Sequence, residues 1–229
     1  MIFGWIIENK EILKIIYALL ICSIAAIITL KTDRLFKISD HQGLRYFRNS
    51  FFFYGLAFFT RFILGKATIS IYKYGEVYQQ ITILLFKFFI IMAGFFLLYS
   101  LIWKHVEKIK NYHSFLNLRV SLFYVATLLI ISLDFIFNTN IFMYLSQVGL
   151  FFILSVLAYK NYIKDKGESV FLKYYFTTML LGFIAWILNT ILYCFLSGDP
   201  GITQIFIYGL NILFFIFFLF GIIKITNKN

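Results

Sequence analysis

Residues 80–103 read QITILLFKFFIIMAGFFLLYSLIW, and Lys87 is the one charged residue in this stretch. A helix needs about 20 predominantly apolar residues to cross the roughly 30 Å hydrocarbon core of a bilayer. The stretch meets this requirement, and it predicts a transmembrane helix.

The composition of the whole chain agrees with this prediction. Of the 229 residues, 62% are hydrophobic, 22% are aromatic and 14% are charged. In soluble domains about a quarter of the residues are charged and about half or fewer are apolar. A soluble domain of this length would have nowhere to bury 31 Phe and 16 Tyr. The composition therefore excludes a disordered chain, a disulfide scaffold and an ordinary soluble enzyme.

Seven segments are long and apolar enough to span a bilayer. They cover about residues 11–30, 47–69, 80–103, 119–137, 141–159, 172–196 and 202–225. The second has the shortest apolar run and includes Arg61 and Lys66, so that without it the count would be six. We predict an all-α, polytopic integral membrane protein, with residues 1–229 as a single seven-helix domain.

The net charge of +11 indicates the orientation of these segments. Lys and Arg are enriched in the cytoplasmic loops of membrane proteins. The basic residues cluster after the first, third, fifth and seventh segments, at Lys31, Arg34, Lys37, Arg45, Arg48, Lys104, Lys108, Lys110, Arg119, Lys160, Lys164, Lys166, Lys173, Lys224 and Lys228. This alternation predicts an external N-terminus and a cytoplasmic C-terminus. Insertion into a lipid bilayer with this orientation also explains the positive net charge, so that no nucleic-acid partner is needed to explain it.

Ionisable side chains inside a bilayer are costly and usually face other helices or a cavity. Arg61, Lys87 and Asp134 lie within the predicted spans, and all three fall in the outer half. Uncharged polar or amphipathic side chains lie at similar depth on the last three segments. We therefore predict a water-accessible pocket for a small polar or anionic ligand, lined by Arg61, Lys87, Asp134, Gln147, Trp186, Asn189 and Asn211.

A packing interpretation explains the same residues without a ligand. Arg61 would pair with Asp134, Lys87 would extend outward to the interface, and the amides would form hydrogen bonds between helices. The sequence alone leaves both interpretations open.

Catalysis lacks the residues that it would need. His41, His105 and His113 all lie in predicted cytoplasmic loops, and Asp134 is the sole carboxylate well inside a predicted span. Cys22 and Cys194 lie inside apolar segments, where a free thiol behaves as a small hydrophobe. No glycine-rich nucleotide-binding pattern is present. We expect no enzyme activity, no metal site and no cofactor.

Seven spans with an external N-terminus resemble the plan of microbial rhodopsins. That family carries retinal on a lysine in the middle of the seventh helix. Here the lysine of the seventh segment, Lys224, lies at its inner end. The resemblance therefore covers the topology and not the chromophore.

Residues 43–49 read GLRYFRN and follow a short basic loop. This layout resembles the seven-helix sensor regions of prokaryotic membrane histidine kinases. The resemblance implies a receptor-like protein of a prokaryotic cell membrane. Since no output domain follows Ile225, signalling would require a separate cytoplasmic partner. A small-solute transporter or channel is the alternative, and a structural or assembly subunit is a second one.

The charge pattern makes the orientation testable. A reporter that is active only in the cytoplasm should be active when fused after Asn229 and silent when inserted near Asp199, because the positive-inside rule puts these sites on opposite sides. Reporter activity in whole cells measures both. The reverse pattern would contradict the span count.

Overall fold

The computed structural model describes residues 10–65, 75–106, 118–164, 170–195 and 201–226. Within these ranges the chain is helical and contains no strand, which confirms the all-α prediction. The helices are α2 (Lys10–Ser39), α3 (Gln42–Phe58), the π-helix η1 (Phe59–Leu64), α5 (Gly75–Val106), α6 (Leu118–Ile136), α7 (Ile141–Lys164), α8 (Val170–Phe195) and α9 (Gly201–Thr226). Since η1 continues α3 directly, these elements form seven rods.

Five of the rods are long and apolar enough to cross a membrane, which supports a multi-pass membrane protein. Their apolar parts are Ile12–Ser39, Val77–Trp103, Ile141–Lys164, Leu172–Phe195 and Phe206–Lys224. The apolar part of α6 is shorter, at Val120–Ile136. Spanning by α6 and by α3 with η1 therefore stays a prediction.

The first helix extends well beyond the expected end near residue 30. It continues to Ser39, so Lys31, Arg34 and Lys37, which were expected in a loop, lie on its last turns, and Arg45 and Arg48 lie on α3. Asp33 accepts a hydrogen bond from Arg48 of α3 and pairs with Lys37 at 2.9 Å, one turn further along α2. Such i,i+4 pairs stabilise a helix that leaves the apolar layer. The chain then reverses at Asp40, whose φ of 48° is left-handed.

Other expected connections fall outside the described residues. These are the segments 66–74, 107–117, 165–169 and 196–200, which include Lys66, Lys108, His113 and Asp199. His41 directly precedes α3, and His105 belongs to α5 rather than to a loop.

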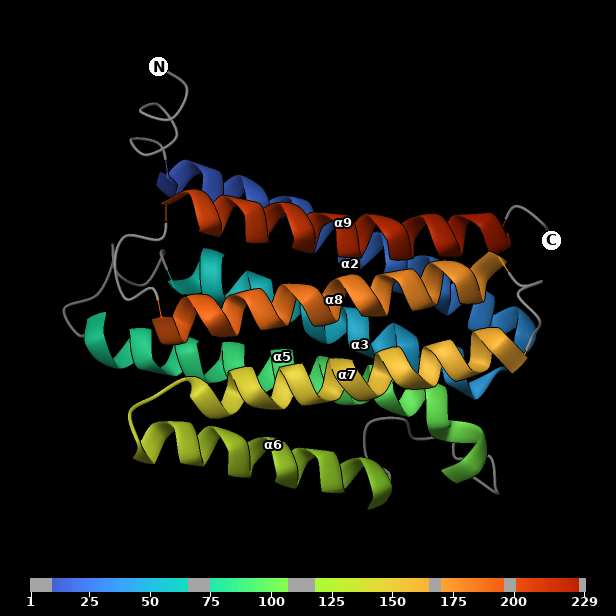
Figure 1. Cartoon of the computed structure of the whole chain (residues 1–229), viewed down its shortest axis with the longest axis horizontal. Coiled ribbons are helices and arrows are strands. Elements are labelled where there is room, and N and C mark those ends of the chain that lie inside the picture. The colour runs from blue at the N-terminus through green and yellow to red at the C-terminus, as the bar shows by residue number, and fades with distance from the viewer. Residues whose placement is uncertain (1–9, 66–74, 107–117, 165–169, 196–200, 227–229) are drawn as a thin grey trace.

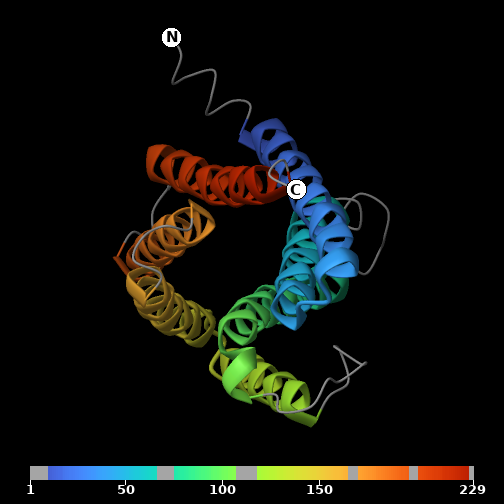
Figure 2. The ribbon, with the colours of Figure 1, turned by 90° about the vertical axis from the view of Figure 1, so that its right-hand side faces the viewer.

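Six helices form a closed ring. Neighbours in contact follow the order α2, α3, α5, α7, α8 and α9, and α9 returns to α2. Figure 2 shows this ring end-on, with α6 outside it against α5 and α7. Figure 1 shows that α2, α5, α7 and α9 all begin at the same end of the bundle. We call this the N-terminal end of the bundle and the opposite one the C-terminal end.

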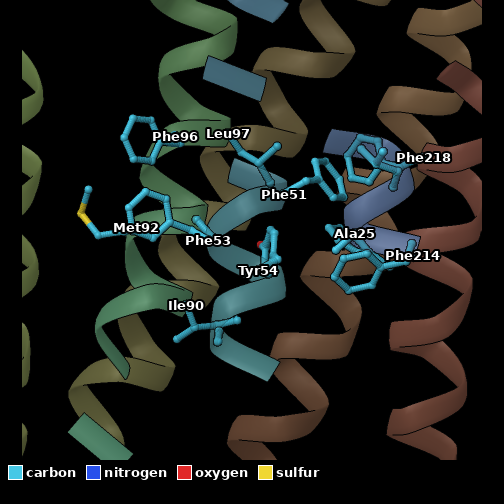
Figure 3. Packing of buried hydrophobic residues seen from close by; sticks show 14 of the residues in the cluster. Ala25, Phe51, Phe53, Tyr54, Ile90, Met92, Phe96, Leu97, Phe214 and Phe218 are labelled. Carbon is cyan, nitrogen blue, oxygen red and sulfur yellow. The ribbon is translucent and has the colours of Figure 1, made fainter. Parts of the chain in front are cut away.

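Aromatic side chains fill the ring toward the C-terminal end. The Phe218 ring of α9 has its centroid 4.9 Å from that of Phe51, 5.3 Å from that of Phe47 and 5.5 Å from that of Tyr175. All four residues are buried, and Figure 3 shows Phe51 and Phe218 in the same packed layer. Buried aromatic pairs add about 0.5–1.5 kcal/mol each beyond their area burial. We call Phe47, Phe51, Tyr175 and Phe218 the aromatic plug.

Close helix contact at Gly182 gives a stability prediction. A Cβ there would lie 2.5 Å from Phe151 Cε1 and 2.9 Å from Phe214 Cε2, whose rings are buried. Gly182→Ala should therefore lower the stability in detergent by about 1–3 kcal/mol, because the rings must shift. Thermal unfolding measures the loss.

Gly149→Ala is the matched control. A Cβ at Gly149 meets nothing within 4 Å, and Ala favours a helix by up to about 1 kcal/mol over Gly. Equal unfolding temperatures for the two variants would contradict the packing described at Gly182.

Candidate ligand-binding site

A central cavity of about 390 Å³ lies in the N-terminal half of the ring. Each of the six ring helices contributes to its wall, whereas α6 contributes no residue. The lining is mostly aromatic, with a few polar side chains among the rings. The main wall residues are Tyr17, Tyr54, Phe58, Arg61, Phe86, Tyr144, Trp186, Asn189, Tyr208, Asn211 and Phe214.

The structure brings four of the seven predicted ligand residues to this cavity. Arg61 comes from η1, Trp186 and Asn189 come from α8, and Asn211 comes from α9. Trp186 and Asn189 are one helical turn apart and share a face, as their spacing predicted. That these side chains bind a ligand stays a prediction.

The two asparagines play different structural parts. Asn211 Nδ2 donates to Tyr17 Oη at 3.0 Å, and this bond joins α9 to α2 where the ring closes. The Tyr17 ring also stacks on Tyr208 with a centroid distance of 4.3 Å. Asn189 Nδ2 instead donates to Ala185 O at 2.9 Å within its own helix. Only Asn211 therefore fits the expectation of amides that hydrogen-bond between helices.

Lys87 and Asp134 form a buried ion pair, with 3.1 Å between Lys87 Nζ and Asp134 Oδ2. Lys87 Nζ also donates to Thr139 O at 3.1 Å. The carboxylate oxygens accept the backbone N–H groups of Phe142 at 3.0 Å and of Met143 at 3.3 Å. Asp134 therefore stabilises the N-terminus of α7, where unpaired N–H groups and the helix dipole favour negative charge.

This pairing corrects the packing interpretation of the charges. The expectation that Arg61 pairs with Asp134 is wrong, and Lys87 does not extend outward to the interface. Charge and depth allowed either cation to reach the carboxylate. The rotation of each helix decides between them, and it turns Lys87 toward α6. Asp134 does not line the central cavity.

Arg61 lies where the central cavity meets a second one of about 320 Å³. We call this second cavity the vestibule. It shares Arg61, Phe86, Met143 and Tyr144 with the central cavity and adds polar side chains. These additional polar residues are Gln79, Thr82, Lys87 and Asn140.

The Arg61 guanidinium is held by rings rather than by a carboxylate. Its Cζ lies 4.5 Å from the Phe86 ring centroid and 5.5 Å from that of Phe62. Within the part of the chain that the structure describes, Arg61 has no ion pair. It belongs to the π-helix η1, a rare element that is frequent at functional sites.

Gln147 lies away from both cavities. It is fully buried, and its amide packs beside Gly94 of α5, where an added Cβ would lie 3.2 Å from Gln147 Oε1. Neither Oε1 nor Nε2 has a hydrogen-bond partner. The structure therefore places Gln147 in a helix contact and not in the predicted pocket wall.

Sequence reasoning missed most of the aromatic wall. Tyr17, Tyr54, Tyr144 and Tyr208 line the central cavity, but 16 Tyr and 31 Phe give no reason to select them. The spacing of Tyr208 and Asn211, one turn apart, was an available signal for a shared face.

The chain is similar to a protein of Archaeoglobus fulgidus that is described only as an uncharacterized protein. The two are 28% identical over 185 residues, and the match covers 76% of each chain. No protein-family model matches the chain, and no solved structure matches it. These comparisons do not identify a family.

The buried ion pair can be tested by a double-mutant cycle. Lys87→Met and Asp134→Asn should each destabilise the protein by about 3 kcal/mol or more, because either change leaves one buried charge unpaired. The double variant should recover part of this loss, with a coupling of about 1 kcal/mol or more. Unfolding in detergent measures all four proteins.

A cycle between Arg61→Gln and Asp134→Asn is the matched control. Since Arg61 does not pair with Asp134, these two losses should add within about 0.5 kcal/mol. Strong coupling in this second cycle and none in the first would overturn the assignment.

Proposed function

We propose that the chain is a receptor-like membrane protein of a prokaryotic cell. Its seven helices span the plasma membrane, with the N-terminus outside and the C-terminus inside. A small polar or anionic ligand binds in the central cavity, and the resulting change passes to a separate cytoplasmic partner. The observation that carries this proposal is the aromatic-walled central cavity in the N-terminal half of the ring.

The size and lining of the cavity support ligand binding. Small-molecule sites are typically about 300–1,000 Å³, mainly apolar, with a few polar groups that orient the ligand. The central cavity, at about 390 Å³, has this character. Its charged and amide side chains come from η1, α8 and α9, so a ligand that touched them would link distant parts of the ring.

The aromatic plug favours a receptor over an open channel. It fills the ring between the central cavity and the C-terminal end. It also continues the cavity wall, since the Phe214 and Phe218 centroids lie 5.0 Å apart and those of Phe51 and Tyr54 lie 5.9 Å apart. Packed side chains of this kind can transmit a shift from one site to another.

The charge distribution supports an output surface at the C-terminal end. Basic residues concentrate near the ends of α2, α7 and α9 on that side, at Lys31, Arg34, Lys37, Lys160, Lys164 and Lys224. The positive-inside rule assigns such an end to the cytoplasm.

A small-solute transporter is the second candidate. Transporter sites commonly use helices that are interrupted at the binding site. The π-helix η1 interrupts the α-helical pattern of the second rod where it reaches both cavities. A transporter would have to open the plug to the other side during its cycle.

Cysteine accessibility separates the two candidates. In a Cys22→Ala, Cys194→Ala background, Asn189→Cys places a thiol in the wall of the central cavity. A membrane-impermeant maleimide should label it on intact cells and not in inverted vesicles, because the plug closes the cytoplasmic side. Gel shift measures the extent of labelling.

Lys37→Cys serves as the orientation control. The Lys37 side chain is 74% exposed at the C-terminal end, so a cysteine there should react in inverted vesicles alone. Labelling of Asn189→Cys from both sides would favour the transporter, and labelling from the cytoplasmic side alone would contradict the proposal.

A further inference from the structure

We propose that the ligand of the central cavity is a small aromatic monoanion, an aromatic carboxylate of about the size of 3-phenylpropionate. Its carboxylate is bound by Arg61, and its ring lies among the aromatic side chains of the wall. This inference rests on the proposed function, because it names the ligand class for the same cavity.

The charge balance of the two cavities sets the charge of the ligand. Among the described residues that line them, Arg61 and Lys87 are the charged ones. Lys87 is neutralised by Asp134, so Arg61 supplies one uncompensated positive charge. Tyrosine adds no negative charge near neutral pH, since its ordinary pKa is about 10. The site therefore matches a ligand with a single negative charge.

The setting of Arg61 suits a carboxylate. A guanidinium that stacks on a ring keeps its N–H groups in its own plane, where they can bind a carboxylate through two parallel hydrogen bonds. The Arg61 Cζ lies over the Phe86 ring, 4.5 Å from its centroid. Arg61 lines both the central cavity and the vestibule, so an anion could reach it from the vestibule without crossing the aromatic wall.

The rest of the cavity suits an aromatic ring. Tyr17, Phe58, Trp186 and Tyr208 present rings from four different segments of the wall. Aromatic groups pack against one another in offset-stacked or edge-to-face geometry. The cavity volume of about 390 Å³ lies toward the lower end of the range of small-molecule sites, about 300–1,000 Å³. A fatty acyl chain has no ring that could pack in this way, which favours a compact aromatic acid over a membrane lipid.

We assign a second polar contact of the ligand to Tyr54, another residue of the cavity wall. The residue is 3% exposed, its hydroxyl has no hydrogen-bond partner, and it lines the cavity wall. Figure 3 shows its ring between the core residues of neighbouring helices. It precedes Arg61 by two helical turns, about 10 Å along the axis. A ligand with a hydroxyl opposite its carboxylate would satisfy this buried group.

Fluorescence titration of the full-length protein tests the proposal. Trp186 lines the cavity and is one of three tryptophans, so Trp5→Phe with Trp103→Phe makes it the sole indole reporter. The probes are 3-phenylpropionate, its neutral amide, 3-(4-hydroxyphenyl)propionate and oleate. We expect saturable quenching by both aromatic acids, with affinity about tenfold or more above that of the amide, because charge-assisted hydrogen bonds are the stronger ones.

Variants assign the effect to individual groups. Arg61→Gln should remove the preference for acid over amide, whereas Arg61→Lys should retain part of it. Tyr54→Phe should remove only the advantage of the hydroxylated acid. Lys224→Gln, the same loss of charge at the far end of α9, should change nothing. Equal unfolding temperatures confirm that each variant is folded.

The outcomes distinguish this inference from the proposed function. Equal binding of acid and amide, unchanged by Arg61→Gln, would overturn the anion and leave a ligand-binding cavity. Tighter binding of oleate than of either aromatic acid would overturn the size class and indicate a lipid source. Failure of all four probes, with Asn189→Cys still labelled from outside, would overturn the ligand class alone.

Discussion

The ion pair between Lys87 and Asp134 determines how the rest of the molecule is arranged. Isolated charges inside a bilayer are costly, and this pair neutralises two of the three charged side chains, Arg61, Lys87 and Asp134, that were predicted in the outer half of the spans. The same carboxylate accepts the first backbone N–H groups of α7, and the same ammonium binds the backbone just before it. One contact therefore connects α5, α6 and α7 at the N-terminal end of the bundle.

Two consequences follow from this contact. The helix α6 is held against the outside of the ring, so it takes no part in the cavity wall. Arg61, without a carboxylate among the described residues, lies on the ring of Phe86 beside the cavity instead. The aromatic composition then has a structural role in each half of the ring. Toward the C-terminal end the rings pack into a plug, and toward the N-terminal end they enclose space.

Sequence periodicity and charge were sufficient to predict the helices, but they did not predict which face of each helix points into the ring. Apolar length predicted every rod, including the one that carries Arg61, because length and hydropathy are local properties. Which cation meets Asp134 depends on helix rotation, and several alternatives satisfied the same depth. Gln147 was expected beside the ligand for its polarity, yet it packs beside Gly94. Tyr54 was missed, since nothing in the sequence distinguishes its hydroxyl from those of the other tyrosines. Only the arrangement of the six helices places it in the cavity wall.

The most direct test of this account is a distance measurement on the protein in lipid bilayers. Solid-state NMR of ¹⁵N-lysine and ¹³C-aspartate protein reports the dipolar coupling between an ammonium and a nearby carboxylate, and Lys87→Gln assigns the signal. The account predicts strong coupling that this variant removes, as required by the 3.1 Å contact between Lys87 Nζ and Asp134 Oδ2. Absence of that coupling, with ¹⁵N-arginine protein showing it from Arg61 to Asp134 instead, would contradict it.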